Sequence, residues 1–261
     1  MKTESYLLES GEQVPLTIAH RRGTRNITIR PQTGPRREIH VSLPYWTPMS
    51  AARTFLEQKR KWIEKIFAAA PKKIRISDGD AITIFGRDVT IRHNPSGRAG
   101  VYWQSEDKSS KLQSQCSNNG VSNPVPGPFD RAEGASVMIV CGSTDMLERR
   151  VRDEIKKLFL TAVKRETAGV PAAFRPRSIA VRDTTSRWGS CSSSGTISFS
   201  WRLAFAPPTV MRYVIMHELA HKRHMDHSVK FWATVSELYG PGVERAKLWL
   251  SKHGQELHRY F

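Results

Sequence analysis

The chain has 261 residues, 39% of them hydrophobic, and its 41 Lys and Arg against 24 Asp and Glu give a net charge of +17. The length suits one large or two small soluble domains, and the three widely spaced cysteines argue against a disulfide framework. No apolar run approaches the roughly 18 residues of a membrane span and no signal peptide is evident, so we expect a cytoplasmic protein.

The first hundred residues predict a β-rich, basic part with one long helix. Alternating residues predict strands at 26–30 and 38–43, joined by a turn at 33–35, with many Arg at the remaining positions. Apolar residues at helical spacing from 52 to 67 predict one helix, which Pro71 ends. Short strands follow at 73–76, 82–85 and 89–91, so residues 1–103 form the expected N-terminal part.

Residues 104–134 are rich in Ser, Asn, Gln, Gly and Pro, and we interpret them as a low-complexity insert or linker that marks the domain boundary. After it, the pattern predicts a strand at 137–141, a helix from about 143 to Gly169, and strands at 178–182 and 196–203. Residues 135–261 are therefore the expected second domain, and the fold class is α+β.

The strongest functional signal is His217-Glu218-Leu219-Ala220-His221, on a helix expected to begin at Pro207 and Pro208. The two histidines are four residues apart and share a helix face, so both imidazoles can reach one ion. Zinc suits them because it accepts neutral imidazole nitrogen. Glu218 is turned by about 100° from His217, so it can act as general base toward a zinc-activated water without binding the zinc.

A catalytic zinc usually takes three protein ligands and leaves one position for water. Three residues are candidates for the third ligand: His227, His224 and Glu237. His224 stays on the helix if the helix continues, whereas Glu237 would match the arrangement with a distal Glu ligand. His227 is favoured because it follows the expected helix end. Asp226 or another carboxylate can orient a ligand through its second ring nitrogen.

A second segment, Arg187-Trp188-Gly189-Ser190-Cys191, precedes this helix and should lie near the site if its strand packs beside the helix. Arg187 can hold a phosphate or a carboxylate, and with Ser190 it is a candidate substrate-binding residue. Gly189 is expected to serve a backbone turn. Cys191 is more typical of a small buried residue than of a nucleophile, which a zinc–water mechanism does not need.

With these segments, the chain resembles the YgjP-like zinc metallopeptidases, which are related to the SprT-like proteins. The resemblance is carried by Ser186–Cys191, Trp201-Arg202-Leu203, Tyr213–Met216 running into the histidine motif, Asp226-His227-Ser228 and Phe231-Trp232. It implies a zincin-like C-terminal half, in which the active-site helix packs on a small sheet. It also implies a zinc site with ligands His217, His221 and His227, and Glu218 as the catalytic base.

Three functions are compatible with these residues. A metallopeptidase is favoured, with a peptide as substrate. The resemblance also implies a nucleoside triphosphate pyrophosphatase on the same zinc site, since family members have been assigned that activity with UTP. A basic nucleic-acid-binding protein with a structural zinc is the third, and the net charge supports a nucleic-acid partner. Glu218 argues against the third, because a structural site normally fills all four positions with protein ligands.

Overall fold

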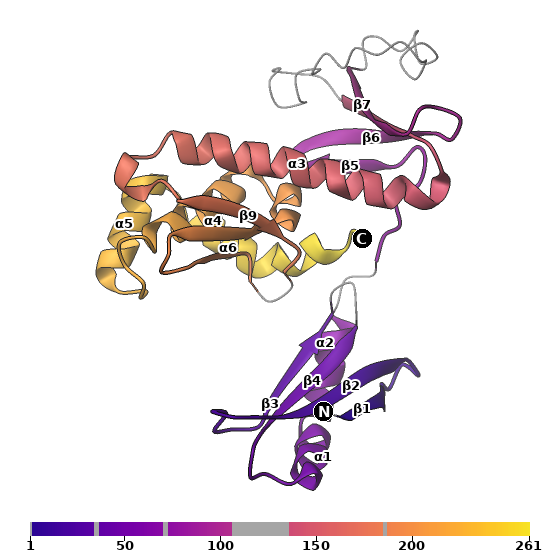
Figure 1. Cartoon of the computed structure of the whole chain (residues 1–261), viewed down its shortest axis with the longest axis vertical. Coiled ribbons are helices and arrows are strands. Elements are labelled where there is room, and N and C mark those ends of the chain that lie inside the picture. The colour runs from indigo at the N-terminus through magenta and orange to yellow at the C-terminus, as the bar shows by residue number, and fades with distance from the viewer. Residues whose placement is uncertain (1, 34–36, 70–72, 106–135, 185–186) are drawn as a thin grey trace. The chain divides into compact units, whose positions relative to one another are not determined.

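The computed structural model describes residues 2–33, 37–69, 73–105, 136–184 and 187–261. The chain forms two compact units, Met1–Lys72 and Lys73–Phe261, which are described separately below (Figure 1). Among the described residues, no helix combines the length and the apolar character that crossing a bilayer requires.

The first unit is a four-stranded sheet against which two helices pack (Figure 1). The strands are β1 (Lys2–Leu7), β2 (Gln13–Arg21), β3 (Thr28–Gln32) and β4 (Glu38–Pro44), in the order β1-β2-β4-β3. β2 and β4 run parallel, and the other neighbours are antiparallel. Helices α1 (Met49–Gln58) and α2 (Arg60–Ala68) supply buried apolar residues, so the sheet and the two helices share one core.

The predicted pairing of the strands at 26–30 and 38–43 is confirmed, because β3 and β4 are antiparallel with Thr28 opposite Ser42. Residues 34 and 35 of the turn expected at 33–35 lie outside the described residues. The expected single long helix is wrong: it is interrupted at Lys59, whose N–H is shared between the carbonyls of Phe55 and Leu56 at 3.1 Å each. No Gly or Pro marks that position, so the sequence carried no breaker signal.

The second unit begins with a sheet of order β5-β6-β8-β7. Its strands are β5 (Ala81–Ile84), β6 (Arg87–Asn94), β7 (Gly100–Ser105) and β8 (Ser136–Cys141). β7 and β8 pair antiparallel, so the strands before and after the segment 104–134 belong to one sheet. The structure therefore divides the chain at Lys72 and Lys73, whereas the sequence analysis placed the boundary at 104–134. Residues 106–135 lie outside the described residues.

A long helix, α3 (Leu147–Ala168), contacts both sheets of the second unit (Figure 1). It follows a short 3-10 helix (Thr144–Met146), and its fully buried residues include Val151, Ile155 and Phe159. After a further 3-10 turn (Ala172–Phe174), the second sheet is built from β9 (Ser178–Arg182), β10 (Gly189–Cys191) and β11 (Thr196–Ser200). Its order is β10-β11-β9, which leaves β10 at one edge.

The strand expected at 196–203 ends at Ser200 and continues as a 3-10 helix (Trp201–Phe205). The reason is burial. A strand with one face in solvent exposes every second side chain, whereas the four consecutive residues 201–204 are all buried. Three helices complete the unit, α4 (Pro208–Ala220), α5 (Val229–Tyr239) and α6 (Val243–His253), followed by a 3-10 helix (Gly254–His258). α4 is buried around most of its circumference and contacts α3, α5, α6, β10 and β11.

Candidate metal centre

The corner between α4 and α5 brings three histidines together. α4 starts with Pro208 in its first turn, as the sequence predicts, and its last residues carry His217 and place His221 at the C-cap. Ser228 is the N-cap of α5, and its hydroxyl accepts the N–H of Phe231 at 3.4 Å. The cap fixes the chain direction directly after His227, which therefore returns to the end of α4.

The ligand atoms of His217, His221 and His227 all lie within 4.8 Å of one another. Nε2 of His227 is 3.3 Å from Nε2 of His217. Two nitrogens bound tetrahedrally to one zinc at about 2.0–2.1 Å are about 3.3 Å apart, so this spacing fits a shared ion. In the part of the chain that the structure describes, these histidines form the one group of three or more potential ligands.

Phe231 packs among the three imidazoles. Its fully buried ring lies 4.9 Å from the ring of His217, 4.5 Å from His221, on which it stacks, and 4.8 Å from His227, measured between centroids. The ring of Trp232 adds an edge contact to His217 at 5.7 Å. This aromatic packing restricts the rotation of all three histidines, so the cluster is organised by the fold itself.

Two histidines of the cluster favour the neutral, metal-binding form of imidazole. Burial, with the nearby His221, His227 and Lys247, lowers the pKa of His217 to about 4, and burial also lowers the pKa of His221. Nδ1 of His221 lies 2.9 Å from the carbonyl oxygen of His224. An N–H donated there leaves Nε2 of His221 free to bind a metal. Nδ1 of His217 is buried without a hydrogen-bond partner among the described residues.

The other candidates for the third ligand lie elsewhere. His224 contributes its backbone carbonyl to His221, and its side chain is not in the cluster. Glu237 is exposed and lines a cavity of about 300 Å³ with Met216 and Arg212. Asp226 is exposed, and its Oδ1 accepts the N–H of Ser228 at 3.4 Å. It therefore contacts the start of α5 and not the imidazole that it was expected to orient.

Glu218 is buried beside the histidines, with only 6% of its surface exposed. Burial raises the pKa of its carboxyl to about 7, against the opposing effect of the Arg187 guanidinium. A pKa near neutrality suits a general base, because the carboxylate is then both available and basic enough to take a proton. A cation bound nearby would lower this pKa again.

The carboxyl of Glu218 rests directly on the backbone of Gly189. A Cβ at Gly189 would stand 2.5 Å from Cγ and 2.6 Å from Oε1 of Glu218, closer than any real contact. Gly189 lies in strand β10 and has no positive φ, so the turn role expected for it is wrong. Glycine is needed here because helix α4 and strand β10 approach each other so closely.

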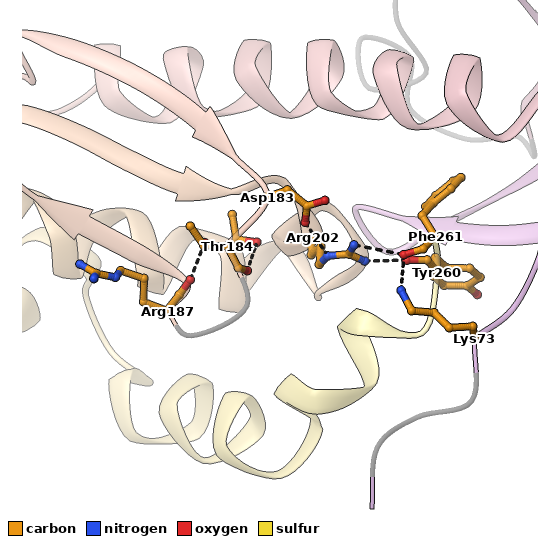
Figure 2. A network of polar contacts seen from close by, with 8 residues as sticks. Lys73, Asp183, Thr184, Arg187, Arg202, Tyr260 and Phe261 are labelled. Atoms are coloured by element: carbon orange, nitrogen blue, oxygen red, sulfur yellow. Dashed lines mark hydrogen bonds and ion pairs between the residues drawn. The ribbon is translucent and has the colours of Figure 1, made fainter. Parts of the chain in front are cut away.

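A buried arginine supports the segment that leads from β9 to β10. Arg202 is fully buried, and its Nε donates to Oδ1 of Asp183 at 3.0 Å (Figure 2). Its terminal nitrogens donate to the carbonyls of Tyr260 at 2.6 Å and Phe261 at 3.3 Å, and Nζ of Lys73 donates to the latter carbonyl as well. The network therefore joins Asp183, directly after β9, to Lys73, Tyr260 and Phe261, which lie far from it in the sequence.

The same segment is fixed at its second end. Oγ1 of Thr184 donates to the carbonyl of Arg187 at 2.8 Å, and the Arg187 side chain points away from this network (Figure 2). Trp188 stacks on the buried ring of His258, with centroids 5.0 Å apart. Trp188 therefore packs against the core. The neighbouring Arg187 is exposed, and its guanidinium lies close enough to Glu218 to lower the pKa of that carboxyl.

The remaining candidates lie on β10. Ser190 is half-buried and pairs with Ser198 of β11. Cys191 is also half-buried, and burial together with Glu218 raises the pKa of its thiol. A thiol with a raised pKa is a poor nucleophile, in agreement with the sequence interpretation. Sequence reasoning missed Asp183 and Arg202 as supports, and the one available signal was a charged residue within the apolar run at 201–204.

Comparison with known proteins agrees with this geometry. The chain matches the YgjP-like metallopeptidase domain over residues 25–125 and 141–253. The protein belongs to the YgjP-like metallopeptidase family, which implies a hydrolase that uses a metal ion, typically zinc. The three-histidine cluster fits such an ion in number and spacing, and the lowered pKa values of His217 and His221 favour neutral imidazoles at these two positions.

Two solved structures are similar over part of the chain. One is the metallopeptidase zymogen abylysin of Pyrococcus abyssi, with 22% identity and a TM-score of 0.29, covering 41% of this chain and 98% of the other. The second is the metallopeptidase zymogen jannalysin of Methanocaldococcus jannaschii, with 16% identity and a TM-score of 0.28, covering 38% and 94%. No curated protein matches the chain.

Proposed function

We propose that the protein is a zinc-dependent metallopeptidase with a zincin-like catalytic half. In this proposal His217, His221 and His227 hold the zinc, and Glu218 is the general base. The observation that carries it is the convergence of the three imidazoles next to a buried carboxyl whose pKa is about 7. One metal-binding face and one proton acceptor are what hydrolysis by an activated water requires.

When bound, zinc would polarise the substrate carbonyl and make a water molecule acidic. Glu218 takes the proton of that water as it attacks and delivers it to the leaving amine. Its burial excludes bulk water, which otherwise would compete for the proton. The backbone of Gly189 supports the carboxyl from the β10 side and so fixes the position from which the proton is taken.

The position of β10 supports a peptide substrate. β10 is an edge strand and has no partner on its outer side within the described ranges. An extended peptide can pair with the backbone N–H and C=O groups of such an edge, which would carry its scissile bond past Glu218. Ser190 on this strand and Arg187 just before it are the proposed substrate-binding residues, with Arg187 available to a substrate carboxylate.

The alternative substrate is a nucleoside triphosphate such as UTP, hydrolysed at the same site. Three cationic side chains close to the site support it. The charge of Arg187 lowers the pKa of Glu218, that of Lys222 lowers the pKa of Cys191, and that of Lys247 lowers the pKa of His217. A triphosphate would gain from this charge, whereas an uncharged peptide would not. Nucleotide hydrolysis would not need the free edge of β10, so we rank a peptide above a nucleotide as the substrate.

The further alternative, a nucleic-acid-binding protein with a structural zinc, ranks third. In the described part of the chain the cluster offers three ligands, whereas a structural zinc normally has four from the protein. A buried carboxyl with a pKa of about 7 also has no purpose beside a structural ion.

The test is to measure zinc content and hydrolysis on the same purified protein, with an unfolded protein and a set of nucleoside triphosphates as substrates. We expect one zinc per chain and peptide cleavage that chelation abolishes. Glu218→Gln should keep the zinc and lose about 10²- to 10⁴-fold in turnover, as expected for loss of a general base. Full activity in that variant would refute the mechanism. Pyrophosphate release without peptide cleavage would select the alternative substrate.

The ligand assignment has its own pair of variants. His227→Ala should weaken zinc binding strongly, because it removes one of three imidazoles. His224→Ala should leave zinc binding almost unchanged, because only the backbone carbonyl of His224 contacts the cluster. Zinc titration against a competing chelator measures both, and the reverse order of affinities would exclude His227 as the ligand.

A further inference from the structure

One end of the sheet in the first unit exposes two large aromatic side chains among arginines. Tyr45 is 68% exposed and Trp46 75% exposed. Arg21, Arg22 and Arg25 are exposed as well. We call these five residues the sheet-end patch. Large aromatic side chains usually bury most of their surface, so two adjacent ones in solvent indicate a binding surface.

The topology of the sheet gathers this patch. β2 and β4 are parallel neighbours with Arg21 opposite Pro44, so the residues that follow both strands emerge at the same end. The chain then crosses from β2 to β3, which lie on either side of β4, and β3 begins with Thr28 opposite Ser42. Arg22 and Arg25 lie on this crossing, close to where β4 ends.

A hydrogen bond joins the two segments of the patch. Nε2 of His20 lies 2.7 Å from the carbonyl oxygen of Thr47, and its ring meets the Tyr45 ring edge-on at 6.5 Å. The backbone on both sides of the aromatic pair is thereby held in place. The aromatic faces are thus presented to solvent by ordered backbone, and a ligand would not have to organise them first.

The arginines are free to bind an anion. Among the described residues, no carboxylate forms an ion pair with Arg21, Arg22 or Arg25, although other basic residues of this unit, such as Arg37 and Arg53, are paired with Glu. Arginine presents its N–H donors in a planar fork that matches a phosphate group. The patch therefore combines phosphate-binding donors with aromatic faces.

We propose that the sheet-end patch binds single-stranded nucleic acid, with bases stacked on Tyr45 and Trp46 and phosphates paired with the three arginines. This pairing of stacking faces and backbone-binding cations is the general solution for single strands, whose bases are unstacked and accessible. A duplex hides its base faces. An anionic membrane fits less well, because stable surface binding to lipid needs a larger buried apolar area than two aromatic side chains supply. The proposal does not depend on the metal centre.

The experiment uses the full chain and a labelled oligonucleotide of about 15 nucleotides, close to the upper end of the roughly 4–16 nucleotides that a single-strand site spans. Fluorescence anisotropy gives its affinity at several salt concentrations, beside a duplex of the same sequence and vesicles of an anionic phospholipid. We expect the single strand to bind more tightly than the duplex, with an affinity that falls as salt rises. Equal or tighter binding of the duplex, or binding to vesicles alone, would overturn the proposal.

Two double variants separate stacking from charge. Tyr45→Ala/Trp46→Ala should weaken single-strand binding about tenfold or more while the salt dependence stays the same. Arg21→Ala/Arg22→Ala should reduce the slope of log affinity against log salt by about 1.4, since each phosphate contact on a single strand contributes about 0.7. All four residues are exposed, so the substitutions should not unfold the protein, and circular dichroism checks that the variants are folded.

The matched control lies on α2. Lys61→Ala/Trp62→Ala removes one charge and one exposed aromatic ring from the same unit, outside the patch. It should leave single-strand binding unchanged. If this control weakens binding as much as Tyr45→Ala/Trp46→Ala does, the binding is a general effect of the basic unit and the assignment to the patch is wrong.

Discussion

Gly189→Ala tests the contact on which the proposed catalytic geometry depends. The added Cβ would stand 2.5 Å from Cγ, 2.6 Å from Oε1 and 2.7 Å from Cδ of Glu218. An ordinary carbon–carbon contact is about 3.5–4.0 Å, so the carboxyl must move by about 1 Å. A displacement of about 1 Å in a reacting group can cost 10²-fold in rate. The three atoms nearest to this Cβ all belong to Glu218, so we expect zinc affinity to change little.

The assay compares turnover, KM and zinc content for the wild type and the variant on the same substrate. We expect kcat to fall about 10²-fold, with full zinc occupancy and a loss of stability of about 1–3 kcal/mol from overpacking. Gly169→Ala is the matched control, because Gly169 has an α-helical φ of −76° and its Cβ would meet nothing closer than 3.8 Å.

Two results would refute this reasoning. Wild-type kcat in Gly189→Ala would mean that Glu218 is not held against β10 in the working enzyme, or that it is not the base. Loss of zinc together with activity would mean that the contact supports the histidine cluster rather than the carboxyl.

Three further predictions concern the surroundings of the site. Phe231→Ala should lower the free energy of unfolding of the metal-free protein by about 3–5 kcal/mol, the usual cost of emptying a buried aromatic site, and denaturant titration with a chelator present measures it. Asp183→Asn should cost about 2 kcal/mol or more, because it leaves the buried Arg202 charge without its partner, although Asp183 is itself 34% exposed. Asp153→Asn, in an exposed pair on α3, is the control and should cost under about 0.5 kcal/mol. Burial, with Arg202 and Lys73, lowers the pKa of His258 from 6.5 to about 4. Between these two pH values the imidazole is protonated in the unfolded chain but not in the folded protein. The free energy of unfolding therefore falls as the pH drops from about 6.5 to 4. His258→Phe should remove up to ~3 kcal/mol of this pH dependence, and an unchanged slope in pH-dependent unfolding would contradict the burial argument.

The histidine helix could be predicted because its signals are local. The spacing of His217 and His221, the prolines at its start and its apolar residues all lie within one short segment. His227 could also be proposed from the sequence, because it lies beyond the expected end of that helix and is therefore free to return toward it. The α+β class is confirmed, and α4 contacts β10 and β11 of the small sheet, whereas the zincin-like arrangement stays a prediction.

Other features could not be predicted because they depend on contacts between distant segments. The role of Gly189 follows from Glu218, which lies on another element, and a glycine in a short polar segment looks like a turn from sequence alone. Arg202 looked like one residue of an alternating strand, and only burial on all sides converts that segment to a 3-10 helix. The helix break at Lys59 depends on small shifts in hydrogen bonding that no residue type encodes.

The pairing of β7 with β8 has a consequence for how this chain can vary. Ser105 lies opposite Ser136, so the chain leaves and re-enters the sheet at neighbouring positions. Changing the length of a connection between such points costs little, about 0.6 kcal/mol for each doubling. The histidine cluster lies on α4 and just before α5, away from both of these strands. The connection between Ser105 and Ser136 can therefore change in length at little cost, and a reporter domain inserted between these two residues should leave zinc binding intact.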